Sequence, residues 1–364
     1  MCNKRDKSAL IAMSGGVDSS VAAWLMLQQG YRCVGATMRL YRNTDIGLSQ
    51  FHTCCSQKDI DDAGEVAFQL DIPYEVLDFT RDFKEKIIGK FIKTYEEGGT
   101  PNPCIDCNRY MKFDKLLQCA ADRGLSYVAT GHYARVEYDR GSERYLLKKA
   151  VDAGKDQSYV LYMLTQAQLS HIRFPLGSKT KAETREIAER LGLCNAQKHD
   201  SQDICFVPDG DYVRFMEQYA GKRYPAGDFL DRAGRVVGRH RGAVGYTLGQ
   251  RKGLGLAMGA PVYVCGKDMD ANTVTVGPEC ALYSRVLYAE DMNWIAVPRL
   301  DGPLRIRAKT RYRQAEQWAT AYPEDGGCIR LEFDMAQRAV TAGQAVVLYD
   351  GDIVVGGGTI RRGL

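Results

Sequence analysis

The sequence lacks long hydrophobic runs, internal repeats and low-complexity tracts, and its 364 residues carry only a small excess of positive charge. The apolar stretch near the N-terminus is about six residues long and leads into glycines, which is too short for a signal peptide or a membrane span. No later stretch is long enough either, so we expect a soluble cytoplasmic protein without membrane contact.

The net charge of +4 permits binding to nucleic acid without requiring it, so evidence for such a partner has to come from local patches. The 12 cysteines occur in a chain that shows no secretory signal. This favours reduced thiols, metal ligands or catalytic groups over a disulfide framework. The length of the chain predicts two or three domains.

Short apolar runs alternate with helical patterns in the first half of the chain, which predicts an α/β fold with a doubly wound, Rossmann-like parallel sheet. A helix is expected over residues 108–124 and a single strand over residues 126–137. Loops at residues 14–19, 38–40 and 130–132 are all expected at the carboxyl edge of the sheet. Ligands bind outside the carboxyl ends of such strands, so the loops predict one shared site.

The pattern changes near residue 210, where glycines become frequent and the predicted strands become short. From residue 285 onward apolar and polar residues alternate between turns such as "EDGG" and "YDGD", which predicts an antiparallel β-barrel or sandwich. We therefore predict a catalytic domain over residues 1–208, a small central domain over residues 209–282 and a C-terminal β-barrel over residues 283–364.

The string "SGGVDSS" at residues 14–20 has the character of a phosphate-binding loop. Its glycines allow close approach to a ligand, Ser19 and Ser20 are candidate caps of the next helix, and a helix N-terminus attracts anions. The lysine of the Walker pattern is missing. The string instead resembles the pyrophosphatase loop of ATP-dependent adenylating enzymes such as asparagine, GMP and NAD synthetases. That resemblance implies cleavage of ATP between its α and β phosphates, with Asp18 near the pyrophosphate as a candidate Mg²⁺ ligand.

Cys107 lies in "TPNPCIDCN", a segment that favours a reactive thiol. If Asn108 begins the following helix, the helix dipole favours the Cys107 thiolate, and Arg109 and Lys112 add positive charge. Such help is needed because an ordinary thiol has a pKa of about 8.5. The segment therefore predicts a nucleophilic cysteine.

Cys205 is a second candidate, because it lies near Lys198 and His199 at the predicted domain boundary. An alternative is that Cys104, Cys107 and Cys205 bind an iron–sulfur cluster or a zinc ion, although the fourth ligand of such a site is not obvious. The sequence leaves both alternatives open. Other cysteines are expected to be small buried hydrophobic residues: Cys33, Cys119, Cys194, Cys265, Cys280 and Cys328.

Several long motifs together resemble the tRNA-specific 2-thiouridylase family, and they span nearly the whole chain. These motifs are "SGGVDSSVAA" (14–23), "TPNPCIDCN" (100–108), "ATGHYAR" (129–135), "KDQSYVLY" (155–162), "SQDICF" (201–206), "YTLGQRKGLG" (246–255), "AKTRYRQ" (308–314) and "GGGTI" (356–360). Their number and order make chance agreement very improbable.

The resemblance implies an enzyme that uses ATP and Mg²⁺ to adenylate C2 of the wobble uridine of tRNA and then replaces that oxygen with sulfur. It implies that Cys205 carries the sulfur as a persulfide and that Cys107 releases it by forming a disulfide with Cys205. A persulfide donor, such as a cysteine desulfurase or a sulfur-relay protein, is then a partner besides tRNA. The chemistry is reasonable, because AMP leaves more readily than the C2 oxygen and a thiol can cleave an S–S bond.

The resemblance also assigns binding residues, motif by motif. Those implied for ATP are Ala12, Met13, Ser14, Gly15, Gly16, Val17, Asp18, Ser19, Met38 and Gly131. Those implied for tRNA are Asn102, Pro103, Cys104, His132, Lys155, Asp156, Gln157, Arg311, Tyr312 and Gln344. Two departures stand out: the tryptophan common after the second-strand methionine is missing, and position 104 is Cys where some members have Asp.

"RIRAKTRYR" places cations at every second residue from Arg305 to Arg313, which would gather them on one face of a strand. An exposed row of this kind predicts contact with a phosphate backbone, and Tyr312 could stack on a base. Two competing interpretations are an amide-forming ligase of the same ATP-cleaving superfamily, which needs no paired thiols, and a non-enzymatic RNA-binding or iron–sulfur protein.

Overall fold

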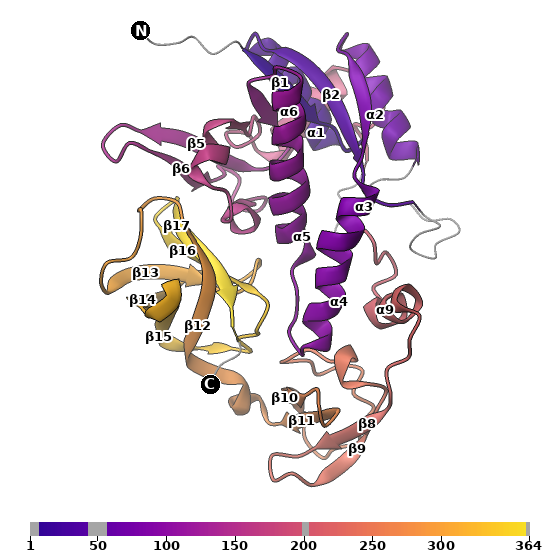
Figure 1. Cartoon of the computed structure of the whole chain (residues 1–364), viewed down its shortest axis with the longest axis vertical. Helices are drawn as coiled ribbons and strands as arrows, with labels where there is room; N and C mark the ends of the chain where they lie inside the picture. The colour runs from indigo at the N-terminus through magenta and orange to yellow at the C-terminus, as the bar shows by residue number, and fades with distance from the viewer. Residues whose placement is uncertain (1–6, 43–56, 199–203, 362–364) are drawn as a thin grey trace.

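The computed structural model describes residues 7–42, 57–198 and 204–361. Figure 1 shows a sheet domain at one end of the long axis, a β-barrel beside its long helices and a small sheet at the other end. In the described ranges, none of the helices has both the length and the apolar character needed to cross a membrane.

The N-terminal domain is built on a parallel sheet with the strand order β3-β2-β1-β4-β7. Its strands are β1 (Ser8–Ala12), β2 (Arg32–Arg39), β3 (Tyr74–Asp78), β4 (Tyr127–Ala129) and β7 (Ile172–Arg173). Because the order changes direction between β1 and β4, the crevice at their carboxyl ends is the expected ligand site. The prediction of a Rossmann-like parallel sheet is confirmed.

Helices cover both faces of this sheet, because β1 is apolar on both sides. Ala9 and Ile11 pack in a core with α1 (Val17–Gln28), α2 (Gln57–Gln69) and α8 (Lys181–Arg190). Leu10 packs in a second core on the other face. The elements there are α3 (Thr80–Phe83), η2 (Lys84–Ile88), α4 (Gly89–Glu96), α5 (Pro103–Asp106), η3 (Cys107–Lys115) and α6 (Leu116–Asp122).

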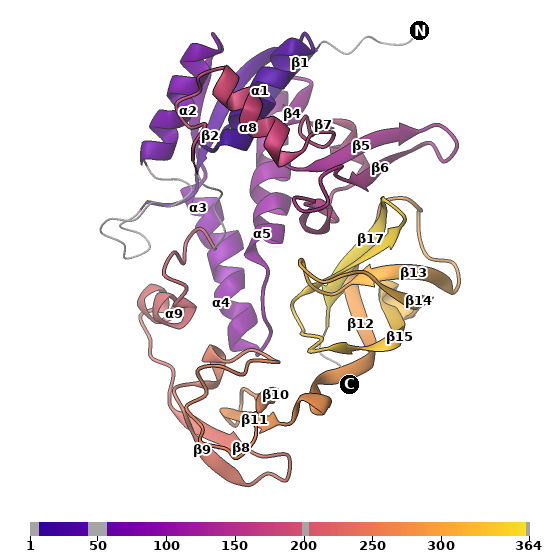
Figure 2. The same cartoon turned by 180° about the vertical axis from the view of Figure 1, so that it is seen from behind.

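The single strand expected over residues 126–137 is wrong, because the structure has two strands there. β4 ends at Ala129, and β5 (Ala134–Asp139) pairs instead with β6 (Arg144–Lys149) in a hairpin that points away from the parallel sheet (Figures 1 and 2). The hairpin joins the barrel sheet through the pair Ile353 and Lys148. η4 (Ser158–Leu161) and α7 (Gln166–Ser170) follow it.

The central module forms a four-stranded sheet with its own core around Phe229, Val264 and Val274. Its elements are α9 (Tyr212–Ala220), β8 (Gly227–Leu230), β9 (Val236–His240), η5 (Ala243–Gly245), β10 (Tyr263–Asp268), β11 (Thr273–Gly277) and η6 (Glu279–Leu282). This agrees with the short strands that the glycine-rich sequence predicts.

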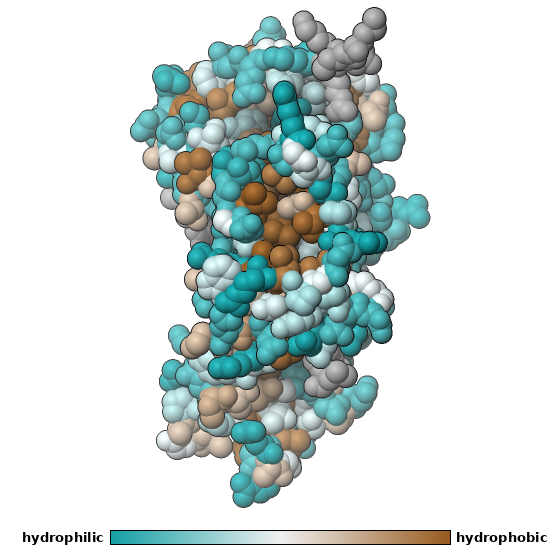
Figure 3. Space-filling model, turned by 90° about the vertical axis from the view of Figure 1, so that its left-hand side faces the viewer, coloured by the Kyte–Doolittle hydropathy of each residue, from teal (hydrophilic) through white to brown (hydrophobic). Residues whose placement is uncertain are grey.

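The C-terminal strands form a closed barrel, as predicted, because β12 pairs with both β15 and β17. The elements are β12 (Tyr283–Trp294), β13 (Leu304–Lys309), β14 (Gln317–Pro323), η7 (Asp325–Gly327), β15 (Ile329–Arg338), β16 (Ala345–Asp350) and β17 (Ile353–Ile360). A hollow of about 450 Å³ on the barrel is lined largely by apolar residues, Ile306 and Val355 among them. An apolar, hollowed area is visible at mid-height on the face in Figure 3.

Candidate active site

The phosphate loop is a tight turn whose shape depends on Gly15. This residue has φ = +70°, and a Cβ added there would lie against the carbonyl oxygen of Asp59 and 2.8 Å from its Cα. The expectation that Ser19 and Ser20 cap α1 is wrong: Gly16 is the N-cap residue, and both serines lie inside the helix. Their hydroxyls donate back to the Gly16 carbonyl at 2.9 and 3.2 Å, since that acceptor is one turn away. The serines therefore brace the loop against the first turn of α1.

The loop after β4 packs directly on the start of α1. A Cβ at Gly131 would lie 2.8 Å from the Asp18 carbonyl carbon and from the Ser19 nitrogen. Only glycine permits this approach, which brings together two of the three loops predicted to share a site. Met38 lies near the end of β2, opposite Leu77 of β3 in the strand register. Its side chain is partly buried in the second core of the sheet domain.

Asp18 is held by side chains from two other segments. The Lys181 ammonium donates to both carboxylate oxygens, at 2.7 and 2.9 Å, and the Tyr133 hydroxyl donates to Oδ1 at 2.9 Å. The Tyr133 hydroxyl also lies 3.1 Å from the Thr184 hydroxyl. The loop that lacks a lysine in sequence therefore has one in space.

Two further side chains hold the back of the loop. The Asn195 amide donates to the Gly15 carbonyl at 3.1 Å and to Ser20 Oγ at 2.9 Å. The Lys198 ammonium donates to the same carbonyl at 3.0 Å and pairs with Asp59 and Asp62. Sequence reasoning assigned no role to Tyr133, although it lies inside the "ATGHYAR" motif, and it missed Lys181 and Asn195, which no local pattern marks.

The donor set around Asp18 fits Mg²⁺ only as an ion that is shared with substrate phosphates. A carboxylate has about four lone-pair positions, and three hydrogen bonds already reach Asp18. Over residues 7–42, 57–198 and 204–361, no group of three or more His, Cys, Asp or Glu side chains is placed to hold a metal ion. Mg²⁺ is commonly bound by one carboxylate together with phosphates, and Asp18 would be that carboxylate here.

The helix that carries Cys107 begins earlier than predicted. Pro103 is its first residue and Asn102 its N-cap, so Cys107 lies one turn inside and its N–H donates to the Cys104 carbonyl. Asn108, the predicted first residue, is instead buried and donates to the Val160 carbonyl at 2.9 Å. From Cys107 the helix continues as a nine-residue π-helix, a form that occurs often at functional sites.

Cys205 is anchored through its own backbone and its neighbour. The Tyr41 hydroxyl donates to the Cys205 carbonyl at 2.7 Å, and Phe206 packs edge-on against Phe83 and Phe91. Cys107, Cys205 and Met38 all border the same apolar core. The structure therefore gathers the two candidate thiols around one core, whereas His199 and residues 201–203 of the "SQDICF" motif lie outside the described residues.

The iron–sulfur alternative for Cys104, Cys107 and Cys205 is not supported. All three are described residues, yet they do not form a group that could hold a metal. Cys104 is exposed, while Cys107 and Cys205 are partly buried at the edge of the core. Burial raises the pKa of the Cys33 thiol to about 11, as expected for an inert cysteine. Cys194 and Cys280 are exposed, so the expectation of burial is wrong for them.

Several residues assigned to tRNA make contacts within the chain. The Asp156 carboxylate accepts from the Ala150 and Ser158 backbone, and Gln157 forms two hydrogen bonds with the Tyr133 backbone. These bonds fix the segment that includes Lys155, which is partly exposed.

Two other such residues, Gln344 and Tyr312, join the barrel to the N-terminal domain. Gln344 donates to the Thr100 carbonyl at 2.9 Å, and the Tyr312 hydroxyl donates to the Asp156 carbonyl at 3.0 Å. Arg311 donates to the Ala339 carbonyl at 2.8 Å. Gln344 and Tyr312 therefore lie where the barrel meets the N-terminal domain, whereas this Arg311 bond stays within the barrel; contact of these residues with tRNA stays a prediction.

His132 is buried between Phe113 and Phe174, with Nδ1 2.7 Å from the Thr130 hydroxyl and Nε2 3.5 Å from the Lys112 ammonium. Burial, reinforced by the Lys112 charge, lowers the pKa of His132 well below 6.5. In this structure its side chain is in the core, and the implied tRNA contact stays a prediction.

A pH dependence of stability follows from His132. The unfolded chain binds a proton at an ordinary pKa of about 6.5, whereas the folded chain binds it only at lower pH. The folded state therefore loses stability as the pH falls below about 6.5. Urea unfolding at pH 5 to 8 should show this loss, and His132→Gln should show a smaller one. Equal pH slopes for both proteins would contradict the expectation.

The row of cations from Arg305 to Arg313 does not lie on one strand face as expected, because β13 ends at Lys309. Arg305 and Arg307 point outward and lie over the ring of the half-exposed Trp318, at 4.9 and 4.8 Å from its centre. Lys309 is partly buried instead, with its ammonium over Tyr159, and burial lowers its pKa. The exposed part of the row is therefore shorter than the sequence indicates.

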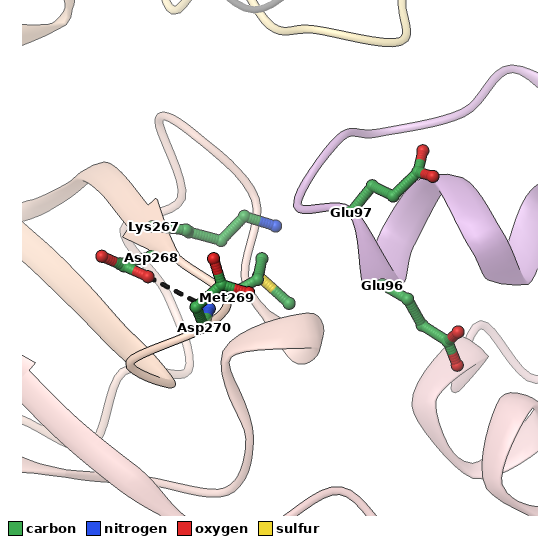
Figure 4. A pocket seen from close by; sticks show the side chains of 6 residues that line it. All are labelled: Glu96, Glu97, Lys267, Asp268, Met269 and Asp270. Carbon is green, nitrogen blue, oxygen red and sulfur yellow. Dashed lines mark hydrogen bonds between the residues drawn. The ribbon is translucent and has the colours of Figure 1, made fainter.

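A second hollow of about 450 Å³ lies between the end of α4 and the β10–β11 turn (Figure 4). Four carboxylates line it around Lys267: those of Glu96, Glu97, Asp268 and Asp270. Such a lining repels phosphate groups, which disfavours a nucleotide here.

Three family models match the chain. A model described as the tRNA methyl transferase HUP domain matches residues 7–209, one described as the tRNA methyl transferase PRC-barrel domain matches residues 213–278, and one described as the aminomethyltransferase beta-barrel domain matches residues 284–360.

Curated relatives match over nearly their full length. The tRNA-specific 2-thiouridylase MnmA of Acetivibrio thermocellus is 50% identical over 356 residues, which are 98% of this chain and 99% of the relative. The protein of the same name from Moorella thermoacetica is 53% identical over 352 residues, or 97% and 99% of the two chains. Among solved structures, a 4-thiouridine synthetase in complex with RNA and ATP aligns with a TM-score of 0.37 and 18% identity, over 59% of this chain and 50% of that one.

Proposed function

The chain belongs to the tRNA-specific 2-thiouridylase family, and from this premise we propose that it forms 2-thiouridine at the wobble position of tRNA, with Cys205 and Cys107 as its reactive thiols. It is an ATP-dependent tRNA-uridine 2-sulfurtransferase. The observation that carries the proposal is identity of about half of all residues to such enzymes over almost the whole chain. Two thiols at the edge of one core, beside the sheet that carries a phosphate loop, agree with it.

The loop at residues 14–19 and Gly131 are proposed to bind ATP across the crevice between β1 and β4. The loop backbone and the start of α1 would receive the phosphates, and Mg²⁺ held with Asp18 would offset their charge. Attack of the C2 oxygen of uridine on the α-phosphate then forms an adenylated base and releases pyrophosphate. No γ-phosphoryl group moves, so the missing Walker lysine is no obstacle.

The sulfur step is proposed to use both thiols in turn. The terminal sulfur of a Cys205 persulfide attacks C2, and AMP leaves with the C2 oxygen. The base is now joined to Cys205 through an S–S bond. The Cys107 thiolate attacks the Cys205 sulfur and breaks this bond. The base keeps the outer sulfur, and a Cys107–Cys205 disulfide forms. An external thiol reductant restores both cysteines, and a persulfide donor protein reloads Cys205.

The proposal is tested with purified protein, ATP, Mg²⁺, a persulfide source, a thiol reductant and unmodified tRNA. Mass spectrometry of the digested nucleosides should show 2-thiouridine only when ATP and the persulfide source are both present. The same spectrum would reveal a methylated uridine, the product expected of a tRNA methyl transferase. Pyrophosphate release without any thiolated nucleoside would overturn the assignment.

We expect Arg307 to contact the tRNA backbone, because it lies on the outer barrel face, whereas Arg305 pairs with Asp334. Arg307→Ala should weaken tRNA binding several-fold and reduce the slope of log affinity against log salt by about one. Arg330→Ala is the control, since Glu324 and Glu332 already pair with that arginine on the barrel. Filter binding at several salt concentrations measures both slopes, and equal slopes for the two variants would contradict the contact.

A further inference from the structure

Lys181 is the one lysine, among the residues that the structure describes, whose side chain is buried in the protein. Its side chain is 10% exposed and that of its partner Asp18 is 30% exposed. A buried ammonium is stable only when it is paired and hydrogen-bonded, and here the ammonium lies between both oxygens of Asp18. The pair therefore fixes two segments that lie 163 residues apart.

The backbone of Lys181 is fixed independently of its side chain. Thr180 and Glu183 form a reciprocal capping box at the start of α8, and the Lys181 N–H donates to Asp152 at 2.9 Å. The capping box and the bond to Asp152 together fix the orientation of the first turn of α8. The ammonium is held at the phosphate loop by the fold and does not reach it by chance.

The pairing matters because Asp18 is itself an anion in a loop proposed to receive phosphates. A bare carboxylate at this place would repel the pyrophosphate part of ATP, and the loop contains no cation of its own. Lys181 neutralises that carboxylate, and together with Tyr133 it limits the directions in which Asp18 can offer a lone pair to Mg²⁺.

We propose that Lys181 is a positioning residue for MgATP, which replaces in space the lysine that the loop lacks in sequence and acts through Asp18. The proposal rests on the proposed function, since it assumes that the loop binds ATP. It predicts that Lys181 affects ligands with β and γ phosphates more than it affects AMP.

Titration calorimetry with MgATP and with AMP tests this on the full-length protein. Lys181→Met should weaken MgATP binding about 10- to 100-fold, as expected for loss of a charged hydrogen bond, and AMP binding less than about threefold. Lys181→Arg should recover most of the MgATP affinity, because it keeps the charge. Lys179→Met is the matched control, since Lys179 is two residues away and pairs only loosely with Glu183, at 3.6 Å.

A double variant guards against the case in which Lys181→Met leaves the partly buried Asp18 carboxylate without its ammonium partner and the protein fails to fold. Asp18→Asn and Lys181→Met together remove both charges. If Lys181 acts through Asp18, the double variant should bind MgATP no more weakly than Asp18→Asn alone. Unchanged MgATP affinity in Lys181→Met, equal loss of MgATP and AMP, or additive losses in the double variant would each overturn the proposal. Failure of the unsubstituted protein to bind ATP would instead overturn the proposed function.

Discussion

Cys205→Ser is expected to abolish formation of 2-thiouridine while pyrophosphate release from ATP continues. A serine hydroxyl cannot carry a sulfane sulfur, so sulfur transfer should fall below about 1% of the unsubstituted rate. Cys107→Ser should cause a comparable loss by another route, because the Cys205 persulfide can still attack C2 but the resulting S–S link between Cys205 and the base lacks the positioned thiol that cleaves it. Nucleoside mass spectrometry and a pyrophosphate assay on the same samples separate the two half-reactions.

Cys119→Ser is the matched control, because Cys119 is also partly buried at the edge of the same core. Burial raises the pKa of its thiol, which makes it a weak nucleophile. This variant should retain thiolation within about twofold of the unsubstituted rate. If Cys205→Ser still thiolates tRNA, the roles proposed for the two cysteines are wrong. If it also loses pyrophosphate release, the thiol is needed for the site as a whole.

Gly15→Ala is expected to lower the rate of ATP-dependent pyrophosphate release about 100-fold, because a displaced loop no longer orients the phosphates. At φ = +70° the new side chain costs about 1–2 kcal/mol of backbone strain, and its Cβ meets the backbone of Asp59. Asp59 cannot withdraw freely, since it lies in α2 and pairs with Lys198. Steady-state kinetics with varied ATP measures the loss.

Gly30→Ala separates loop displacement from backbone strain. Gly30 follows α1 with φ = +77° but has nothing within 4 Å of an added Cβ. The variant should therefore lose about 1 kcal/mol of stability and keep its rate of pyrophosphate release. A similar loss of activity in both variants would show that general destabilisation, and not the position of the loop, causes the effect of Gly15→Ala.

The sequence predicted the elements whose signals are local. The order of strands and helices in the first domain, the change to short strands near residue 210 and the C-terminal barrel all follow from periodicity and turn residues, and the structure confirms them. The errors are also local in origin. Residues typical of strands on both sides of Gly131 hid the break between β4 and β5, and the helix signal at Asn108 obscured the earlier start at Pro103.

By itself the sequence determined that a phosphate loop without a lysine and two candidate thiols belong to one chain, because these features are contiguous motifs. Only the tertiary structure decided what surrounds them. Lys181 reaches Asp18 across 163 residues, and Lys198 reaches the Gly15 carbonyl across 183. Such contacts leave no periodic or local trace, since they depend on how α8 and the segment after it pack against the loop. The fold therefore brings two lysines from distant segments to residues 14–20, which contain none.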